Sequence, residues 1–191
     1  MNLERVIANF FNHIHDAQQY ELYNEAGLQH ELGFFLRSNL DSTYSVQLER
    51  NIEVLGVDKS NFHKKEMDLY IFDADKSERY CIEIKFPRKG AFPRRMFQTF
   101  EDIYFLEQLR IDAGFKQVRC IFITDQSGFR NGRETNGFYR YFRKDYFIGQ
   151  PQEEEVPHFL KSEVQSILIK EKHEFVWNTF RDKFHYFVIV F

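Results

Sequence analysis

The sequence predicts an α/β protein with a mixed central β-sheet flanked by helices, in the order helix, three strands, helix, strand. Apolar residues recur at helical spacing in the first 38 residues. Two runs rich in Ile, Tyr and Phe then flank a polar turn, as in a strand hairpin. After a further helical segment, the nearly continuous apolar run Val118 to Thr124 is typical of a strand buried on both faces in a parallel pairing.

The N-terminal part predicts two amphipathic helices. The first begins after Asn2, a suitable N-cap, and continues to about Ile14. The second extends from about Asn24 to Ser38, and its apolar stripe consists of Leu28, Leu32, Phe35 and Leu36. Glu31 lies within this stripe, so we expect it to point toward the core. A position at the edge of the stripe, toward Arg37, is the alternative.

Three strands are expected next, and the last two form a hairpin. Thr43 to Val54 alternates apolar and polar residues. A basic loop follows, whose composition fits a surface near phosphate but is more often that of a solvated turn. Its charged and titratable residues are Lys59, His63, Lys64 and Lys65.

The hairpin extends from Glu66 to Phe86. If Asp73 faces Glu78 across its polar turn, the antiparallel register places Asp68 opposite Glu83. Because side chains alternate along a strand, Lys85 then shares a face with both carboxylates. Burying these charges among apolar neighbours needs a compensating partner such as a metal. The alternative is an internal salt-bridge cluster without metal, in which Lys85 pairs with Asp68 or Glu83.

Helix-breaking residues end the hairpin, and a helix is expected from Pro93 to Gly114. The segment from Tyr80 to Thr124 is thus a strand, helix, strand crossover. No acidic residue occurs between Ile84 and Phe100, which makes this the densest uncompensated positive charge in the sequence. The basic residues are Lys85, Arg88, Lys89, Arg94 and Arg95.

In the C-terminal part, aromatic residues interleave with arginines from Gln126 to Lys144. This pattern suits either stacking on bases with phosphate binding or a protein partner. Further strands are expected at Val164–Lys170, Glu174–Trp177 and Phe184–Phe191. The last is apolar enough to belong to the sheet or to an oligomer interface. We expect one domain over residues 1–191, with a core at about 24–125 and an extension at about 126–191.

Composition narrows the class of protein. The chain has 191 residues, of which 43% are hydrophobic and 18% aromatic, enough for a sizeable core. The net charge of −3 means that nucleic-acid binding would need a local basic patch. No run approaches the ~20 apolar residues of a membrane helix, and no signal-peptide pattern is present, so we expect a cytoplasmic protein. No nucleotide-cofactor motif occurs. Cys81 and Cys120 lie in predicted strands, as small buried hydrophobic residues.

The order of these charged residues resembles the PD-(D/E)xK nuclease superfamily, over Gly27 to about Thr124. The resemblance consists of a helix with Glu31, a strand with Asp68, a strand with Glu83-Ile84-Lys85, and a helix with Gln98. Two departures occur. Met67 stands where the family name records a proline. Gln98 is followed by Glu101 and Asp102, with no aromatic residue four positions on as in the Gln-x-x-x-Tyr exonucleases.

The resemblance implies a restriction-endonuclease-like core and a Mg²⁺-dependent endonuclease acting on DNA, working as a homodimer in restriction or defence. It implies metal ligation by Asp68, Glu83 and the Ile84 carbonyl, with Glu31 acting through water or at a second metal. Mn²⁺ would substitute for Mg²⁺. Lys85 would orient the attacking water, and Gln98 would be a further catalytic residue. The nucleic-acid-binding residues would be Arg88, Lys89, Arg94, Arg95, Arg130 and Arg133. The alternative is a nuclease-like fold that binds nucleic acid or protein through Phe129 to Lys144 without catalysis.

Overall fold

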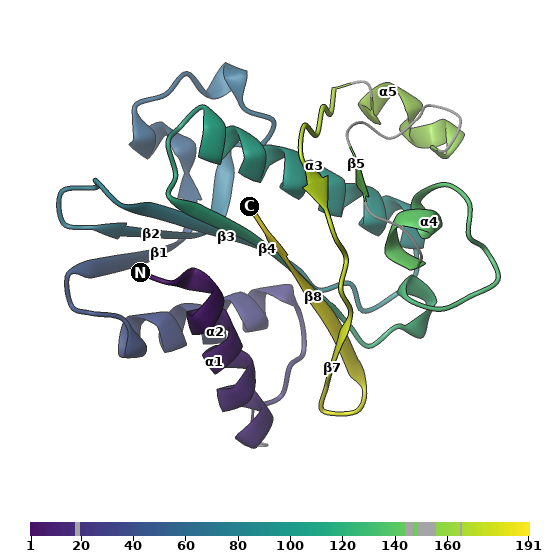
Figure 1. The fold of residues 1–191 in the computed structure, drawn as a ribbon, viewed down its shortest axis with the longest axis horizontal. Helices are drawn as coiled ribbons and strands as arrows, with labels where there is room; N and C mark the ends of the chain where they lie inside the picture. Colours follow the sequence, from purple (N-terminus) through teal and green to yellow (C-terminus); the bar gives the residue numbers. More distant parts are fainter. Residues whose placement is uncertain (18–19, 144–146, 149–155, 165) are drawn as a thin grey trace.

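A six-stranded mixed β-sheet with helices on both faces forms the centre of the molecule (Figure 1). The structure is a computed structural model that describes residues 1–17, 20–143, 147–148, 156–164 and 166–191. In spatial order the strands are β1 (Tyr44–Asn51), β2 (Glu66–Asp73), β3 (Arg79–Lys85), β4 (Gln117–Thr124), β8 (Phe184–Val190) and β7 (Asn178–Phe180). The predicted α/β class is confirmed.

The helices and a second, smaller sheet complete the described fold. The helices are α1 (Leu3–Asp16), α2 (Glu25–Asn39), α3 (Phe92–Ile111), α4 (Phe138–Arg143) and α5 (Lys161–Val164). Strands β5 (Phe147–Ile148) and β6 (Lys172–His173) form the two-stranded sheet. The order α2, β1, β2, β3, α3, β4 is the one that the sequence predicts. Among the described helices, none combines the length and apolar character that crossing a membrane requires.

The hairpin of β2 and β3 has the predicted register. Leu69 lies opposite Ile82, and continuing this antiparallel register by one pair places Asp68 opposite Glu83. At the turn, the Asp73 N–H donates to the Glu78 carbonyl at 3.2 Å. Strand β3 then pairs with β4 in parallel through the α3 crossover, while β8 adds antiparallel to β4. The central strands β3 and β4 therefore have neighbours on both sides and lie deep in the sheet.

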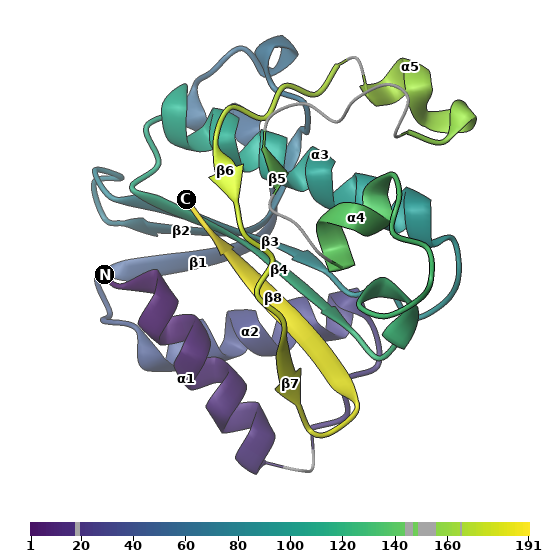
Figure 2. The same ribbon diagram turned by 45° about the vertical axis from the view of Figure 1, so that its right-hand side comes forward.

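The two faces of the sheet have separate hydrophobic cores. Helices α1 and α2 cover one face, and α3 with α4 covers the other (Figure 2). Because side chains alternate, Ile82 and Ile84 pack on the α1–α2 side, while Cys81 packs on the α3 side. Both cysteines are buried and free, as predicted. Glu83 follows the same alternation, so a fully buried carboxylate faces α3.

Helix α2 begins where a side chain caps it and packs closely on the sheet. The Asn24 side chain accepts the Gly27 N–H at 2.7 Å, which satisfies one of the free amides of the first turn. Further along, a Cβ at Gly33 would lie 3.2 Å from Leu48, so glycine permits the close approach of α2 to β1. The cap and this contact together fix which residues of α2 face the sheet.

The prediction of strands near the C-terminus is wrong for two of the three segments. Residues 166–171 and 174–177 form no strand in the described structure, whereas β8 occupies the third predicted range and pairs with β4. Hydrogen bonds to side chains, and not strand pairing, fix the segment between α5 and β6. The buried Glu107 carboxylate of α3 accepts the Lys170 and Glu171 N–H groups at 2.8 and 2.9 Å. An apolar run that is anchored to a helix carboxylate in this way needs no strand partner.

Candidate functional site

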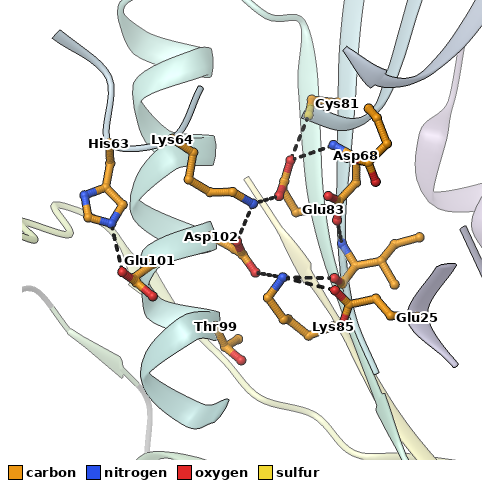
Figure 3. A network of polar contacts seen from close by, with 12 residues as sticks. Glu25, His63, Lys64, Asp68, Cys81, Glu83, Lys85, Thr99, Glu101 and Asp102 are labelled. Atoms are coloured by element: carbon orange, nitrogen blue, oxygen red, sulfur yellow. Dashed lines mark hydrogen bonds and ion pairs between the residues drawn. The ribbon is translucent and has the colours of Figure 1, made fainter. Parts of the chain in front are cut away.

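The candidate site is a cluster of charged side chains at the end of the β2–β3 hairpin (Figure 3). The Asp68 N–H donates to Glu83 Oε1 at 3.1 Å, and the Ile84 N–H donates to Asp68 Oδ2 at 2.7 Å. Both amides lie just beyond the last paired residues of the ladder. The two carboxylates thus satisfy backbone donors that the separating strands leave free, which ties each carboxylate to the opposite strand.

Lys85 extends from β3 toward α3 and α2. Its side chain is largely buried, and its Nζ lies 3.1 Å from Asp102 Oδ2 and 3.6 Å from Glu25 Oε1. It also donates to the Ile84 carbonyl at 3.2 Å. An internal ion-pair cluster is therefore present, but the expected pairing of Lys85 with Asp68 or Glu83 is wrong. Helix carboxylates hold this lysine instead.

Lys64 places a second ammonium group in the cluster. Its Nζ donates to Glu83 Oε2 and, at 2.7 Å, to Asp102 Oδ1. Asp102 is 1% exposed and reaches the cluster from the buried face of α3. The expectation that Lys64 belongs to a solvated turn is wrong, because the loop before β2 directs this side chain inward beneath α3 (Figure 3).

Glu31 does not reach the cluster. Its half-exposed carboxylate lies 4.0 Å from His30, and it borders a small cavity with Phe10 and Ile14 of α1. The carboxylate of α2 that does reach the site is Glu25, which accepts the Phe86 N–H at 2.8 Å. The expected inward position of Glu31 is wrong, because α2 turns the Leu28, Gln29, Leu32, Gly33 and Leu36 side toward the protein interior.

The position of Gln98 also differs from the expected one. Its side chain accepts a hydrogen bond from Arg95 at 2.9 Å and forms no hydrogen bond with the cluster residues in the described part of the chain. The two acidic residues that follow it are the ones engaged near the site. Glu101 lies 3.2 Å from His63 Nε2, and Asp102 holds both lysines. The helix after β3 therefore contributes an aspartate where the resemblance implies a glutamine.

The basic strip after β3 is largely compensated in the fold. Arg88 pairs with Asp125 at 2.9 Å and donates to the Leu22 and Tyr23 carbonyls. Arg94 pairs with Glu163 at 2.5 Å. These acidic partners lie far from the strip in sequence, so the expectation of uncompensated charge is wrong for both arginines. Lys89 and Arg95 are exposed and have no ion pair within the described residues.

A pocket of about 560 Å³ lies beside the cluster. It is lined by Tyr23, Asn24, Glu25, Lys85, Phe86, Pro87, Arg88, Lys89 and Arg95. Because Lys85 belongs both to this lining and to the cluster, the pocket connects the buried charges with the solvent. Its rim carries the two exposed cations of the basic strip.

The phenylalanines between residues 129 and 143 do not form a stacking surface. Phe129, Phe138 and Phe142 are at most 2% exposed and pack in the core under α3. The expected base-stacking role of this segment is therefore wrong for these rings. Arg130 is half-buried and Arg133 is exposed, and neither lines the pocket beside Lys85. Lys144 lies outside the described residues.

Burial dominates the electrostatics of the cluster. It raises the pKa of Asp68 to about 6, although Lys64, Lys85 and the Ile84 N–H oppose this shift. Burial, followed by the neighbouring Asp68 charge, also raises the pKa of Glu83. Burial alone would lower the pKa of Lys64 and Lys85, but the surrounding carboxylates raise it above its ordinary value. Both lysines are therefore charged at neutral pH.

The donor atoms are of the kind that Mg²⁺ prefers. Asp68, Glu83 and Asp102 offer carboxylate oxygens only, and Ile84 adds a carbonyl. In the described part of the chain, no three His, Cys, Asp or Glu side chains are already arranged around a metal position. A cation does, however, lie between two of the carboxylates, namely the Lys64 ammonium. The chemistry of the donors fits a hard divalent cation.

Comparison with known proteins gives no further assignment. No protein-family model, no curated protein and no solved structure matches the chain. The chemistry of the site therefore has to be inferred from its own residues.

Asp68 should give the metal-free protein a characteristic dependence of stability on pH. Its pKa is higher in the folded state than in the unfolded state, so its contribution is favourable at low pH. That contribution is lost as the pH rises from about 4 through about 6. We expect a loss of about 3 kcal/mol, measured by urea unfolding in the presence of a chelator. Asp68→Asn should lack this component, and an unchanged pH profile in that variant would contradict the assignment.

Proposed function

We propose that this chain is a Mg²⁺-dependent nuclease that hydrolyses DNA and has a restriction-endonuclease-like core of the PD-(D/E)xK type. The observation that carries the proposal is the register of β2 and β3. It places Asp68 opposite Glu83, with Lys85 two residues further along the same strand. The order of elements from α2 to β4 and the parallel pairing of β3 with β4 support it further.

Asp68 and Glu83 are the residues that would hold the metal, with the Ile84 carbonyl as a third donor. When bound, Mg²⁺ supplies a water of lowered pKa and stabilises negative charge on the phosphate oxygens. Lys85 lies beside this position and opens to the pocket, where its ammonium can orient a water and face developing charge. Asp102 and Glu25 keep the Lys85 ammonium charged and fix its direction.

The charge count of the cluster favours this proposal over a purely structural ion-pair cluster. When all are ionised, three buried carboxylates face two ammonium groups, and the partly exposed Glu25 carboxylate also shares Lys85, so negative charge exceeds positive charge among the described cluster residues. Buried ion pairs contribute little net stability even when they are balanced, and an unbalanced carboxylate is costly. A metal site explains the surplus, because hard cations require ionised oxygen donors.

The pocket beside Lys85 gives the DNA backbone a route to the site. Lys89 and Arg95 line it with exposed charges that form no ion pair with any described residue, as phosphate contacts require. Arg88 and Arg94 are committed to internal partners and are assigned to structure instead. Phe129, Phe138 and Phe142 are assigned to the core, and binding of nucleic acid or protein through this segment without catalysis stays an alternative prediction. The homodimer expected from the resemblance stays a prediction.

Removing the charges of the catalytic strands should abolish cleavage without unfolding the protein. We expect Asp68→Asn and Lys85→Ala each to lower the rate of Mg²⁺- or Mn²⁺-dependent DNA cleavage by about 100-fold or more. Far-UV circular dichroism should stay unchanged. Glu66→Gln is a matched control, because Glu66 is an exposed carboxylate on the same strand as Asp68. Cleavage at the wild-type rate in either folded variant would refute the proposed function.

Substitutions in the basic strip should affect either DNA binding or protein stability. Lys89→Ala and Arg95→Ala should each weaken DNA binding and leave stability unchanged. Each should also lower the slope of log affinity against log salt concentration by about one, the value for one phosphate contact. Arg88→Ala should instead destabilise the fold by about 2 kcal/mol, because it removes an ion pair and two bonds to backbone carbonyls.

Fluorescence anisotropy of a labelled oligonucleotide in chelator, at several salt concentrations, measures the binding. Urea unfolding measures the stability. Arg5→Ala is the matched control. This arginine is exposed and lies in the first turn of α1, near the N-terminus, and the Met1 amino group donates to the Tyr80 hydroxyl at the other end of β3. If Lys89→Ala and Arg95→Ala bind DNA as Arg5→Ala does, the proposed route of the backbone is wrong.

A further inference from the structure

The ammonium group of Lys64 occupies a position between two carboxylates that come from different elements. Glu83 lies on β3 and Asp102 on α3, and both are almost fully buried. The two residues are 19 positions apart in sequence, so the α3 crossover is what brings them together. Two buried carboxylates that hold an ammonium between them would stabilise a metal cation at the same position as well.

Asp102 retains capacity to accept a further interaction. Its Oδ1 accepts from Lys64, while Oδ2 lies 3.1 Å from Lys85 Nζ but receives no hydrogen bond of good geometry among the described residues. A fully buried carboxylate oxygen with only a Coulombic partner is under-coordinated. The Asp102 carboxylate could therefore coordinate a metal cation, which requires a more defined ligand geometry than an ammonium does.

Charge balance distinguishes the two possible occupants of this position. When all are ionised, the carboxylates of Asp68, Glu83 and Asp102, with Glu25 beside Lys85, exceed the positive charge of Lys64 and Lys85 by two. If a divalent cation replaces the Lys64 ammonium, the excess falls to one. Replacement thus lowers the surplus of negative charge, which leaving Lys64 in place does not.

Lys64 can leave without rearrangement of the sheet. It belongs to the short segment between the 3₁₀ turn at Lys59–Asn61 and β2, and its side chain is 26% exposed. Its Nζ also lies 5.6 Å from the centre of the Phe105 ring, an attractive contact that the lysine would lose on leaving. Rotation of the lysine side chain toward solvent would free both carboxylates.

We propose that the Lys64 ammonium and a divalent cation are alternative occupants of the position between Glu83 and Asp102. On this inference, which rests on the proposed function, Asp102 replaces Glu31 as the helix carboxylate of the metal site. Lys64 is then a positioning residue. It keeps the carboxylates apart and neutralised while the metal is absent, and it lowers the apparent metal affinity because it must be displaced.

Binding of Mn²⁺ alone tests the exchange without any measurement of cleavage. Isothermal titration calorimetry gives the affinity, and the loss of the free Mn²⁺ signal in electron paramagnetic resonance confirms it. We expect Lys64→Met to bind Mn²⁺ about tenfold tighter than wild type or more, and Asp102→Asn to bind about tenfold weaker. Lys65→Met is the matched control, because this neighbouring lysine is exposed and donates to the Phe62 carbonyl.

A second pair of variants covers the case in which Lys64→Met does not fold without metal. Asp102→Asn with Lys64→Met removes one charge of each sign, so the cluster keeps its charge count. We expect this double variant to bind Mn²⁺ about tenfold tighter than Asp102→Asn alone, since Glu83 no longer has a competing ammonium.

The outcomes separate the exchange from the proposed function. If wild type binds Mn²⁺ and removal of Lys64 does not tighten binding in either background, the exchange is refuted and the nuclease proposal stands. If Asp102→Asn binds Mn²⁺ as wild type does, Asp102 is not a ligand, and the assigned position of the cation is wrong. If neither wild type nor any variant binds Mn²⁺ at millimolar concentration, both the exchange and the proposed function fail.

Discussion

The separation of β2 from β3 beyond Leu69 and Ile82 is the constraint on which the site depends. Where the ladder ends, two backbone N–H groups require acceptors, and the carboxylates of Asp68 and Glu83 provide them. Carboxylates held in this way cannot turn toward water, so burial raises their pKa. Cations on neighbouring elements are therefore needed to keep them ionised. A loop, two strands and two helices each contribute a charged group to this one place (Figure 3).

Local chemistry was enough to predict the hairpin and its register, but not the partners of its charges. The polar turn and strict alternation fix which residues of β2 and β3 lie opposite each other, because a slip by one residue would exchange the two faces. Lys64 gave no such signal, since its loop has no periodicity. Asp102 gave a partial one. Phe105 and Leu106 follow it at helical spacing, but the preceding Gln98 and Thr99 are polar, so the criterion that wrongly selected Glu31 is met on only one side of Asp102.

The same contrast explains the basic strip and the aromatic segment. In sequence, Arg88 and Arg94 have no acidic neighbour, yet Asp125 and Glu163 neutralise them across the fold. Density of charge along a chain therefore overestimates the charge that a folded surface presents. Aromatic residues between arginines are equally ambiguous, because rings such as Phe138 can fill a core while their polar neighbours reach solvent. Long-range pairing decides both cases, and a single sequence does not contain it.

An internal counter-ion reconciles the stability of the protein with a site of high negative charge. Apolar residues of similar volume would stabilise this position at least as well as the ion pairs do, so stability alone does not account for the charges. Without Lys64, the three buried carboxylates would share with Glu25 the one remaining ammonium, a cost of several kcal/mol by the usual order of magnitude for uncompensated buried charge. A lysine on a partly exposed loop offsets that cost and can still withdraw. The strand lysine, held by Asp102 and Glu25, stays in place. The two lysines thus have the same charge but different roles, because one is tethered by a sheet and the other by a turn.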